Sequence, residues 1–314
     1  MEIKEYTENI VSRLEKLRPE LKFTVNEHVK KNNGVELVGI TISKDNSGIA
    51  PIIYINDYYE QECPINDAIV QILSIYDHHA NPDFGFINPD EFLSFDNVKD
   101  RIIAKLVNKD KNIFMMNEVP YAQFGDMMVI FAIMVQGDEK GIASARVTNQ
   151  MMNSWKVNLS QIIEVAYKNT RKLFPMEIDN MHDLLMKMLD ERSDLTEEQK
   201  EEILGARPEV EMSVVSNKYK CNGSYFITDR KALLKVAKKI KANSFYILPS
   251  SIHEFIVIPK DTQNMSEDEM LNMVKEVNET QVPYDAILAD NVYVFDSTTE
   301  ELSTISGTVI PFIA

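Results

Sequence analysis

Glycine and cysteine are both scarce in this sequence of 314 residues. The 10 glycines form neither a GxGxxG nor a GxxxxGK[ST] pattern, so the common loops whose backbone N–H groups hold phosphate are absent. The two cysteines, Cys63 and Cys221, stand far apart and form no CxxC or zinc-ligand spacing. We therefore predict a protein of a reducing compartment that carries no cofactor.

Long apolar runs and positive charge are also lacking. No run is long enough to span a bilayer, and the opening residues 1–11 lack the apolar centre of a signal peptide. Lys and Arg total 33 against 49 Asp and Glu, a formal net charge of -16. Such a charge repels phosphate backbones and anionic membrane surfaces. We expect a cytoplasmic protein that binds neither nucleic acid directly nor a membrane.

Two apolar runs joined by a short turn are the strongest structural signal that is present. FYIL at 245–248 and FIVI at 255–258 are rich in β-forming residues, and Pro249-Ser250-Ser251 lies between them. Continuous apolarity is typical of strands that are covered on both faces. We predict a buried hairpin with helices packed over it.

Helical and strand-like patterns along the chain predict an α+β fold, with two mixed, mainly antiparallel sheet units covered by helices. Spacing and caps indicate helices at 3–18, 64–80, 158–173, 181–189, 196–204, 230–241 and 266–277. Strands are expected at 22–31, 35–42, 51–55, 98–107, 126–135, 142–147, 212–219, 225–228 and 291–295, with a turn at Gly137-Asp138.

Composition and pattern divide the chain into three parts. We predict an N-terminal α/β unit at 1–147, a helical bridging segment at 148–206 and a C-terminal α+β unit at 207–314. The stretch 207–211, with Pro208, is the expected linker before the last unit.

Four stretches of the sequence resemble a known family. They are VKDRIIAKLVNKDKNIFMMNEVPYAQFGDMMVIF, VTNQMMNSWKVNLSQIIEVAYKN, FYILPSSIHEFIVIP and ILADNVYVFD. Together they are similar to the uncharacterised Firmicutes family catalogued as domain of unknown function 5688, over most of residues 95–296. The resemblance implies a bacterial, cytoplasmic protein and no activity, cofactor or catalytic residue.

Ser, His and Glu crowd the turn of the predicted hairpin. Ser251, His253 and Glu254 suggest a nucleophile, a base and a carboxylate of a hydrolase. However, neighbours along a strand point to opposite faces, and no GxSxG elbow accompanies them. His253-Glu254 begins like HExxH, but Val257 stands where the second ligand would be. The alternative is an exposed polar end of the hairpin.

Cys63 and the pair His78-His79 mark the two ends of one predicted helix. Cys63 precedes Pro64 at the amino end, a position that favours a thiolate and hence a nucleophile paired with a remote His. A small, partly buried cysteine is the alternative. His78 and His79 are candidate metal ligands, although as cations they also suit the carboxyl end of a helix.

The sequence contains no complete catalytic or cofactor signature and leaves three functions open. We expect a non-enzymatic cytoplasmic binding or regulatory protein, with a protein partner possible. A hydrolase of unrecognised type, using Cys63 or the Ser250–Glu254 turn, is the alternative. Acidic stretches at 190–202 and 267–279 suggest a decoy for a nucleic-acid-binding protein, or ordinary solvated helices. The basic stretch 230–241 suits an acidic partner, or the protein's own acidic helices.

Overall fold

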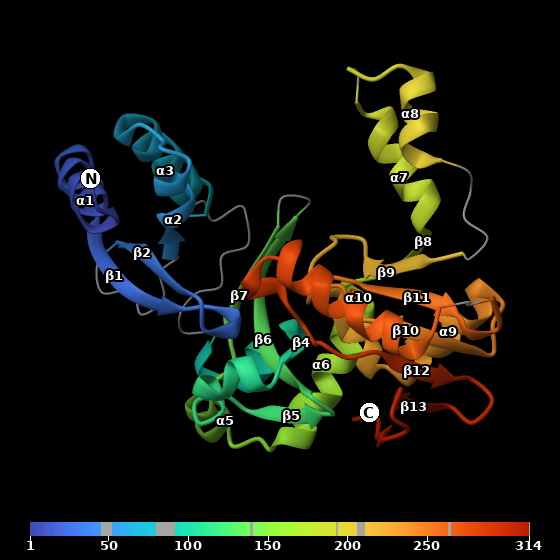
Figure 1. The fold of residues 1–314 in the computed structure, drawn as a ribbon. Coiled ribbons are helices and arrows are strands. Elements are labelled where there is room, and N and C mark those ends of the chain that lie inside the picture. The colour runs from blue at the N-terminus through green and yellow to red at the C-terminus, as the bar shows by residue number, and fades with distance from the viewer. Residues whose placement is uncertain are drawn as a thin grey trace. The chain divides into compact units, whose positions relative to one another are not determined.

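The computed structural model in Figure 1 divides into two compact units, Met1–Val98 and Lys99–Ala314. Both units combine helices with antiparallel strands, which confirms the predicted α+β fold. The structure describes residues 1–44, 52–79, 92–138, 141–192, 194–205, 211–262 and 265–313.

The N-terminal unit places two long helices against a small antiparallel sheet. The sheet has the order β1-β2-β3, formed by Lys22–Lys30, Glu36–Ser43 and Ile52–Tyr54. The helices are α1 (Ile3–Leu17), α2 (Asn56–Glu60), α3 (Ile65–His79) and the short α4 (Phe95–Val98). Apolar spacing predicted these strands and the two long helices, and the structure confirms them.

One apolar cluster holds this unit together. Ile10 and Leu14 of α1 meet Ile40 and Ile42 of β2, together with Ile72 of α3, and all five are at most 1% exposed. The i, i+4 spacing in the helix and the i, i+2 spacing in the strand put each pair on one face. Burial of each such side chain contributes about 1.5–3 kcal/mol.

The boundary between the units lies at 98/99, and the strands after it belong to the C-terminal unit. The sequence instead placed residues up to 147 in the N-terminal unit. Long-range bonds explain the difference. Asn108 donates to the carbonyl of Leu288 at 2.9 Å, and Tyr293 donates to the carboxylate of Asp126. The expected linker at 207–211 lies almost wholly outside the described residues.

The first sheet of the C-terminal unit is built on the long strand β6 (Met127–Asp138). This strand pairs with β4 (Ile102–Asn108), β5 (Tyr121–Phe124) and β7 (Gly141–Arg146), always antiparallel. The predicted turn at Gly137-Asp138 is wrong, because both residues pair with β7 and extend the strand. The turn signal was local, whereas the register is set by the partner strand.

The second sheet has seven antiparallel strands in the order β14-β13-β12-β10-β11-β9-β8. The predicted hairpin is confirmed, with β10 between β11 and β12 near the middle of the sheet. Phe245 and Tyr246 lie on opposite faces and both are buried. The strands are β8 (Met176–Asn180), β9 (Ser213–Asn217), β10 (Ser244–Leu248), β11 (Phe255–Pro259), β12 (Tyr293–Asp296), β13 (Glu301–Thr304) and β14 (Val309–Ile310).

Two features of this unit differ from the prediction. The expected strand at 225–228 is part of a buried 3₁₀ segment, η6 (Gly223–Thr228). The bridging segment 148–206 is not wholly helical, because it includes β8, an edge strand that pairs with β9. All residues of β8 are half-buried, so the strand lacks the apolar alternation by which a sequence shows one.

The helices of this unit begin at the caps that the sequence predicted. Asn158 and Gln161 form a capping box, as do Ser266 and Glu269. The helices are α5 (Asn149–Trp155), α6 (Leu159–Leu173), α7 (Met181–Asp190), α8 (Glu197–Leu204), α9 (Arg230–Ile240) and α10 (Glu267–Thr280), with further 3₁₀ turns η4 (Lys99–Arg101), η5 (Asp110–Met115), η7 (Lys260–Thr262) and η8 (Tyr284–Ala286). Across the described ranges, no helix combines the length and hydropathy needed to cross a bilayer.

Candidate functional site

A surface pocket of about 600 Å³ opens beside Cys63 in the N-terminal unit. This volume falls within the range of small-molecule sites. Met1 and the α1 residue Tyr6 contribute one part of the wall, and the rest comes from the end of α2, the start of α3 and the connection between them. The lining residues are Met1, Tyr6, Tyr59, Glu60, Glu62, Cys63, Pro64 and Ile65.

A tight reversal between α2 and α3 brings these side chains together. Helix α2 ends at Glu60, and Glu62 just beyond it has φ 51°, the left-handed conformation common after a helix. The N–H of Glu62 donates to the carbonyl of Tyr59 at 3.1 Å, and that of Cys63 to the carbonyl of Tyr58 at 2.8 Å. Pro64 immediately precedes α3, a position at which the N–H that proline lacks would form no hydrogen bond within the helix.

The two tyrosines of the pocket offer aromatic surface, because their hydroxyls are already engaged. Tyr6 donates to the carbonyl of Cys63 at 2.6 Å, and Tyr59 donates to that of Met1 at 2.8 Å. Their rings meet edge to face, with centroids 5.8 Å apart. Burial, with smaller contributions from Cys63 and Tyr58, raises the pKa of Tyr6, so its ring stays neutral.

Negative charge dominates the rim of the pocket. Glu60 and Glu62 are exposed, and neither forms an ion pair with another residue that the structure describes. The amino end of α3 also reaches the pocket, but a helix terminus is equivalent to only about half a positive charge. The two carboxylates outweigh it, so the pocket favours a cation.

Cys63 shows none of the partners that a cysteine nucleophile needs. Its thiol has one described hydrogen bond, a weak one of 3.8 Å to the carbonyl of Pro64, and no histidine is among the described lining residues. His78 and His79 lie in the last turn of α3, but their side chains are outside the described part. The described residues include no group of three His, Cys, Asp or Glu that could hold a metal ion.

The Ser250–Glu254 turn is half-buried and bonded mainly to itself and to the chain near residue 222. The Ser251 hydroxyl accepts from the backbone N–H of His253 at 3.0 Å. The imidazole Nδ1 of His253 instead accepts from the backbone N–H of Asn222 at 3.3 Å. Among the described contacts, serine hydroxyl and imidazole are therefore not hydrogen-bonded to each other.

The surroundings of His253 favour its neutral form. Burial lowers its pKa and the charge of Lys105 adds to the effect, although Glu254 and Asp285 oppose it. The carbonyl of His253 accepts from the N–H of Gly223 at 2.9 Å and from the Ser216 hydroxyl at 2.8 Å. This turn is a packed joint, since a Cβ on Gly223 would lie 2.5 Å from that carbonyl oxygen.

Sequence reasoning gave no role to the second cysteine, Cys221, which lies beside this joint. The amide Nδ2 of Asn222 lies 3.0 Å from the sulfur of Cys221. Burial raises the pKa of the Cys221 thiol, against an opposing contribution from Lys105, so the thiol form is favoured. No sequence pattern marks Cys221, because the charge that acts on its thiol, Lys105, is distant in the sequence.

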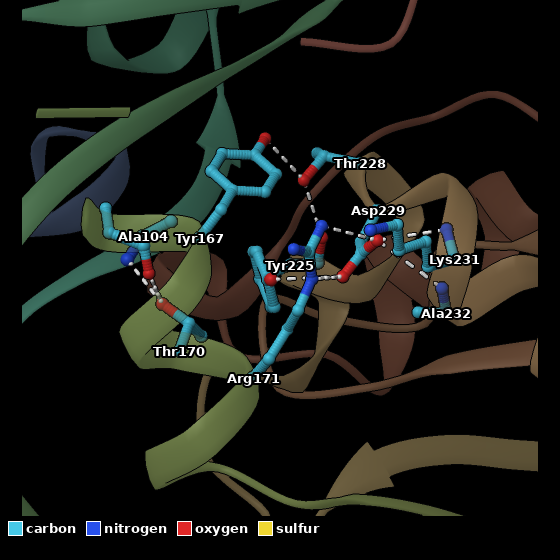
Figure 2. Close-up of polar contacts among 10 residues, drawn as sticks. Ala104, Tyr167, Thr170, Arg171, Tyr225, Thr228, Asp229, Lys231 and Ala232 are labelled. Carbon is cyan, nitrogen blue, oxygen red and sulfur yellow. Dashed lines mark hydrogen bonds and ion pairs between the residues drawn. The ribbon is translucent and has the colours of Figure 1, made fainter. Parts of the chain in front are cut away.

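An ion pair between half-buried Arg171 and buried Asp229 links α6 to the start of α9, as Figure 2 shows. The guanidinium of Arg171 donates to the carboxylate of Asp229 at 2.5 and 3.0 Å, and the Asp229 side chain is only 2% exposed. The same carboxylate accepts from the backbone N–H groups of Lys231 and Ala232, and so caps α9. Tyr225 adds a bond of 3.3 Å. Each polar group here serves the packing, so we assign the network to stability.

The fold and the pocket define an α+β protein with an acidic, aromatic site of small-molecule size. The family model for the family of unknown function DUF5688 matches residues 3–297, and the chain belongs to this family. The match confirms the resemblance drawn from the sequence and extends it over the N-terminal unit. Comparison with curated proteins and with solved structures gives no match.

Proposed function

We propose that this protein is a non-enzymatic, cytoplasmic binding or regulatory protein whose pocket at Cys63 takes a small organic cation. One observation supports the proposal. Two aromatic and two acidic side chains line the same cavity of about 600 Å³, namely Tyr6, Tyr59, Glu60 and Glu62. Aromatic rings and carboxylates are the groups that recognise alkylammonium ions.

Magnitudes favour a cationic ligand over a neutral one. A cation over an aromatic face gains about 0.5–1 kcal/mol at an exposed site and about 2 kcal/mol when water is excluded. Each carboxylate at about 4 Å adds about 1 kcal/mol in water. A neutral ligand of the same shape gains neither contribution. We expect weak but charge-selective binding.

Hydrolysis is less well supported. Cys63 has no described imidazole partner in the pocket, and the imidazole of His253 is bonded to a backbone N–H and not to Ser251. A nucleophile without a base in reach gains little rate. Binding without turnover is therefore the function that this geometry supports best.

The test is calorimetric titration of the full chain with choline and with its uncharged isostere 3,3-dimethyl-1-butanol. We expect saturable binding of choline and none of the isostere. Removing one rim charge in Glu60→Gln or Glu62→Gln should weaken binding about fivefold, corresponding to about 1 kcal/mol. Tyr59→Leu should weaken it similarly, because it keeps apolar bulk and loses the aromatic face.

Two matched variants serve as controls. Glu15→Gln removes an exposed carboxylate of α1 that does not line the pocket, and Tyr59→Phe keeps the ring. Both should bind choline as the wild type does. Equal binding of choline and its isostere, or no binding of choline at millimolar concentration, would refute the proposal.

A further inference from the structure

Helices α7 and α8 form a hairpin in which few of the described side chains are buried. Figure 1 shows the two helices extending away from the seven-stranded sheet, beyond β8. No residue of α7 is buried, and Leu185, Met188 and Ile203 are 45%, 65% and 60% exposed. Helices of ten and eight residues are marginal in water unless an apolar face is packed. We therefore expect the exposed apolar side chains of this hairpin to be covered by another surface.

The hairpin is acidic, and its tip most of all. Residues 181–204 include eight Asp and Glu against three Lys and Arg, a net charge of -5. Residues 190–198, which include the adjoining ends of the two helices, have five acidic residues and one arginine. Glu191 and Glu198 are exposed there and have no ion-pair partner within the described ranges.

Helix α9 offers the opposite charge. Residues 230–241 include six Lys and Arg and no acidic residue. Arg230 pairs with Glu300 at 3.5 Å. The remaining cations are exposed and have no carboxylate partner among the residues that the structure describes, namely Lys231, Lys235, Lys238, Lys239 and Lys241. This basic face is an anomaly in a chain with a net charge of -16.

We propose that two copies of this chain associate through these surfaces, the tip of each α7–α8 hairpin lying on α9 of the other copy. Helix α9 packs beside β8, the strand from which the hairpin starts. Two hairpins placed antiparallel therefore bring each tip to the base of the other, where α9 lies. The ten residues of α7 span about 15 Å, and a two-fold arrangement satisfies both contacts at once and closes. The exposed apolar side chains of α7 then cover each other.

A charge-reversal exchange tests this dimer with the full chain. One variant, Glu191→Lys/Asp194→Lys/Glu198→Lys, changes the net charge of residues 190–198 from -4 to +2. The other, Lys231→Glu/Lys235→Glu/Lys238→Glu/Lys239→Glu, changes that of residues 230–241 from +6 to -2. Light scattering after size-exclusion chromatography should show a wild-type dimer that dissociates at 1 M salt, where the screening length is about 3 Å. Each variant alone should be a monomer, since its tip and α9 now repel each other.

The decisive sample is the mixture of the two variants. Every contact in their heterodimer joins opposite charges, so an equimolar mixture should regain the dimer mass, which also shows that both variants are folded. The control variants Lys168→Glu on α6 and Glu279→Lys on α10 reverse exposed charges elsewhere and should remain dimeric. A monomeric wild type, dimeric single variants, or a mixture that stays monomeric would overturn the proposal.

Discussion

At the scale of single residues, burial decides which ionisable groups respond to pH. His253 sits in a packed joint and accepts a backbone hydrogen bond on Nδ1, so the proton that would charge it has to displace that bond. Burial lowers its pKa below the ordinary 6.5. The unfolded chain then binds a proton more readily than the folded chain in the pH range just below 6.5.

His253 should therefore make folding sensitive to mild acid. Above pH 6.5 both states are neutral and the group has no effect on the pH dependence. As pH falls below that value the unfolded state is protonated first, so the free energy of unfolding decreases by up to about 1.4 kcal/mol per pH unit. We expect His253→Gln to flatten this decrease in urea titrations between pH 7 and pH 5.

The matched control is His28→Gln, which changes an exposed histidine of β1 that is paired with Glu36. It should leave the acid-dependent loss below pH 6.5 in place. A His253→Gln variant that is as acid-sensitive as the wild type would show that this imidazole is not the group responsible.

At the scale of secondary-structure elements, the Arg171–Asp229 pair couples α6 to α9 and caps α9 at the same time. Asp229→Ala should lower the free energy of unfolding by about 3 kcal/mol, because it leaves the Arg171 charge unpaired and removes an N-cap. Urea denaturation followed by circular dichroism measures the loss. Asp229→Asn keeps a capping oxygen and should cost less than Asp229→Ala.

An exposed pair between α9 and the residue before β13 provides the comparison for that prediction. Arg230 and Glu300 are 3.5 Å apart and both about half exposed, so Arg230→Gln should change stability by no more than about 0.5 kcal/mol. Equal losses for Asp229→Ala and Arg230→Gln would contradict the assignment of Asp229 to a buried, structural network.

The sequence was informative where an element is defined by its own residues. The cap at Asp229, the capping box at Asn158 and the apolar runs of β10 and β11 are local, and all four features are present. The edge strands β8 and β14, and β13 beside β14, were missed, because their partners, not an apolar alternation, hold them in place. The buried segment 225–228 is rich in β-forming residues, yet it folds as 3₁₀ turns, so tertiary packing overrode propensity.

The candidate site was predictable only in part for the same reason. Cys63 could be singled out, since Pro64 marks the start of a helix. Tyr6, however, lies 57 residues away and joins the pocket only after α1 packs beside α3. Glu62 was not predictable, because nothing in the sequence shows that its backbone adopts φ 51° and closes the pocket wall.

At the scale of the whole molecule, the two units have cores of their own, and the division can be measured. Ile10 and Phe245 are both 0% exposed, one in the apolar cluster of the N-terminal unit and one in β10. Truncating either to alanine should cost about 3 kcal/mol. If the units unfold separately, each variant should increase hydrogen exchange only in its own unit, Met1–Val98 or Lys99–Ala314.

Strands β4 and β6 distinguish the two possible boundaries. They fall in the N-terminal unit if the division is at 147, as the sequence suggested, and in the C-terminal unit if it is at 98/99. Because Asn108 and Asp126 bond to Leu288 and Tyr293, we expect peptides from 102–108 and 127–138 to exchange faster in Phe245→Ala and to be unchanged in Ile10→Ala. Faster exchange of these peptides in Ile10→Ala would place the boundary after β7 and would make the long-range bonds secondary to packing within residues 1–147.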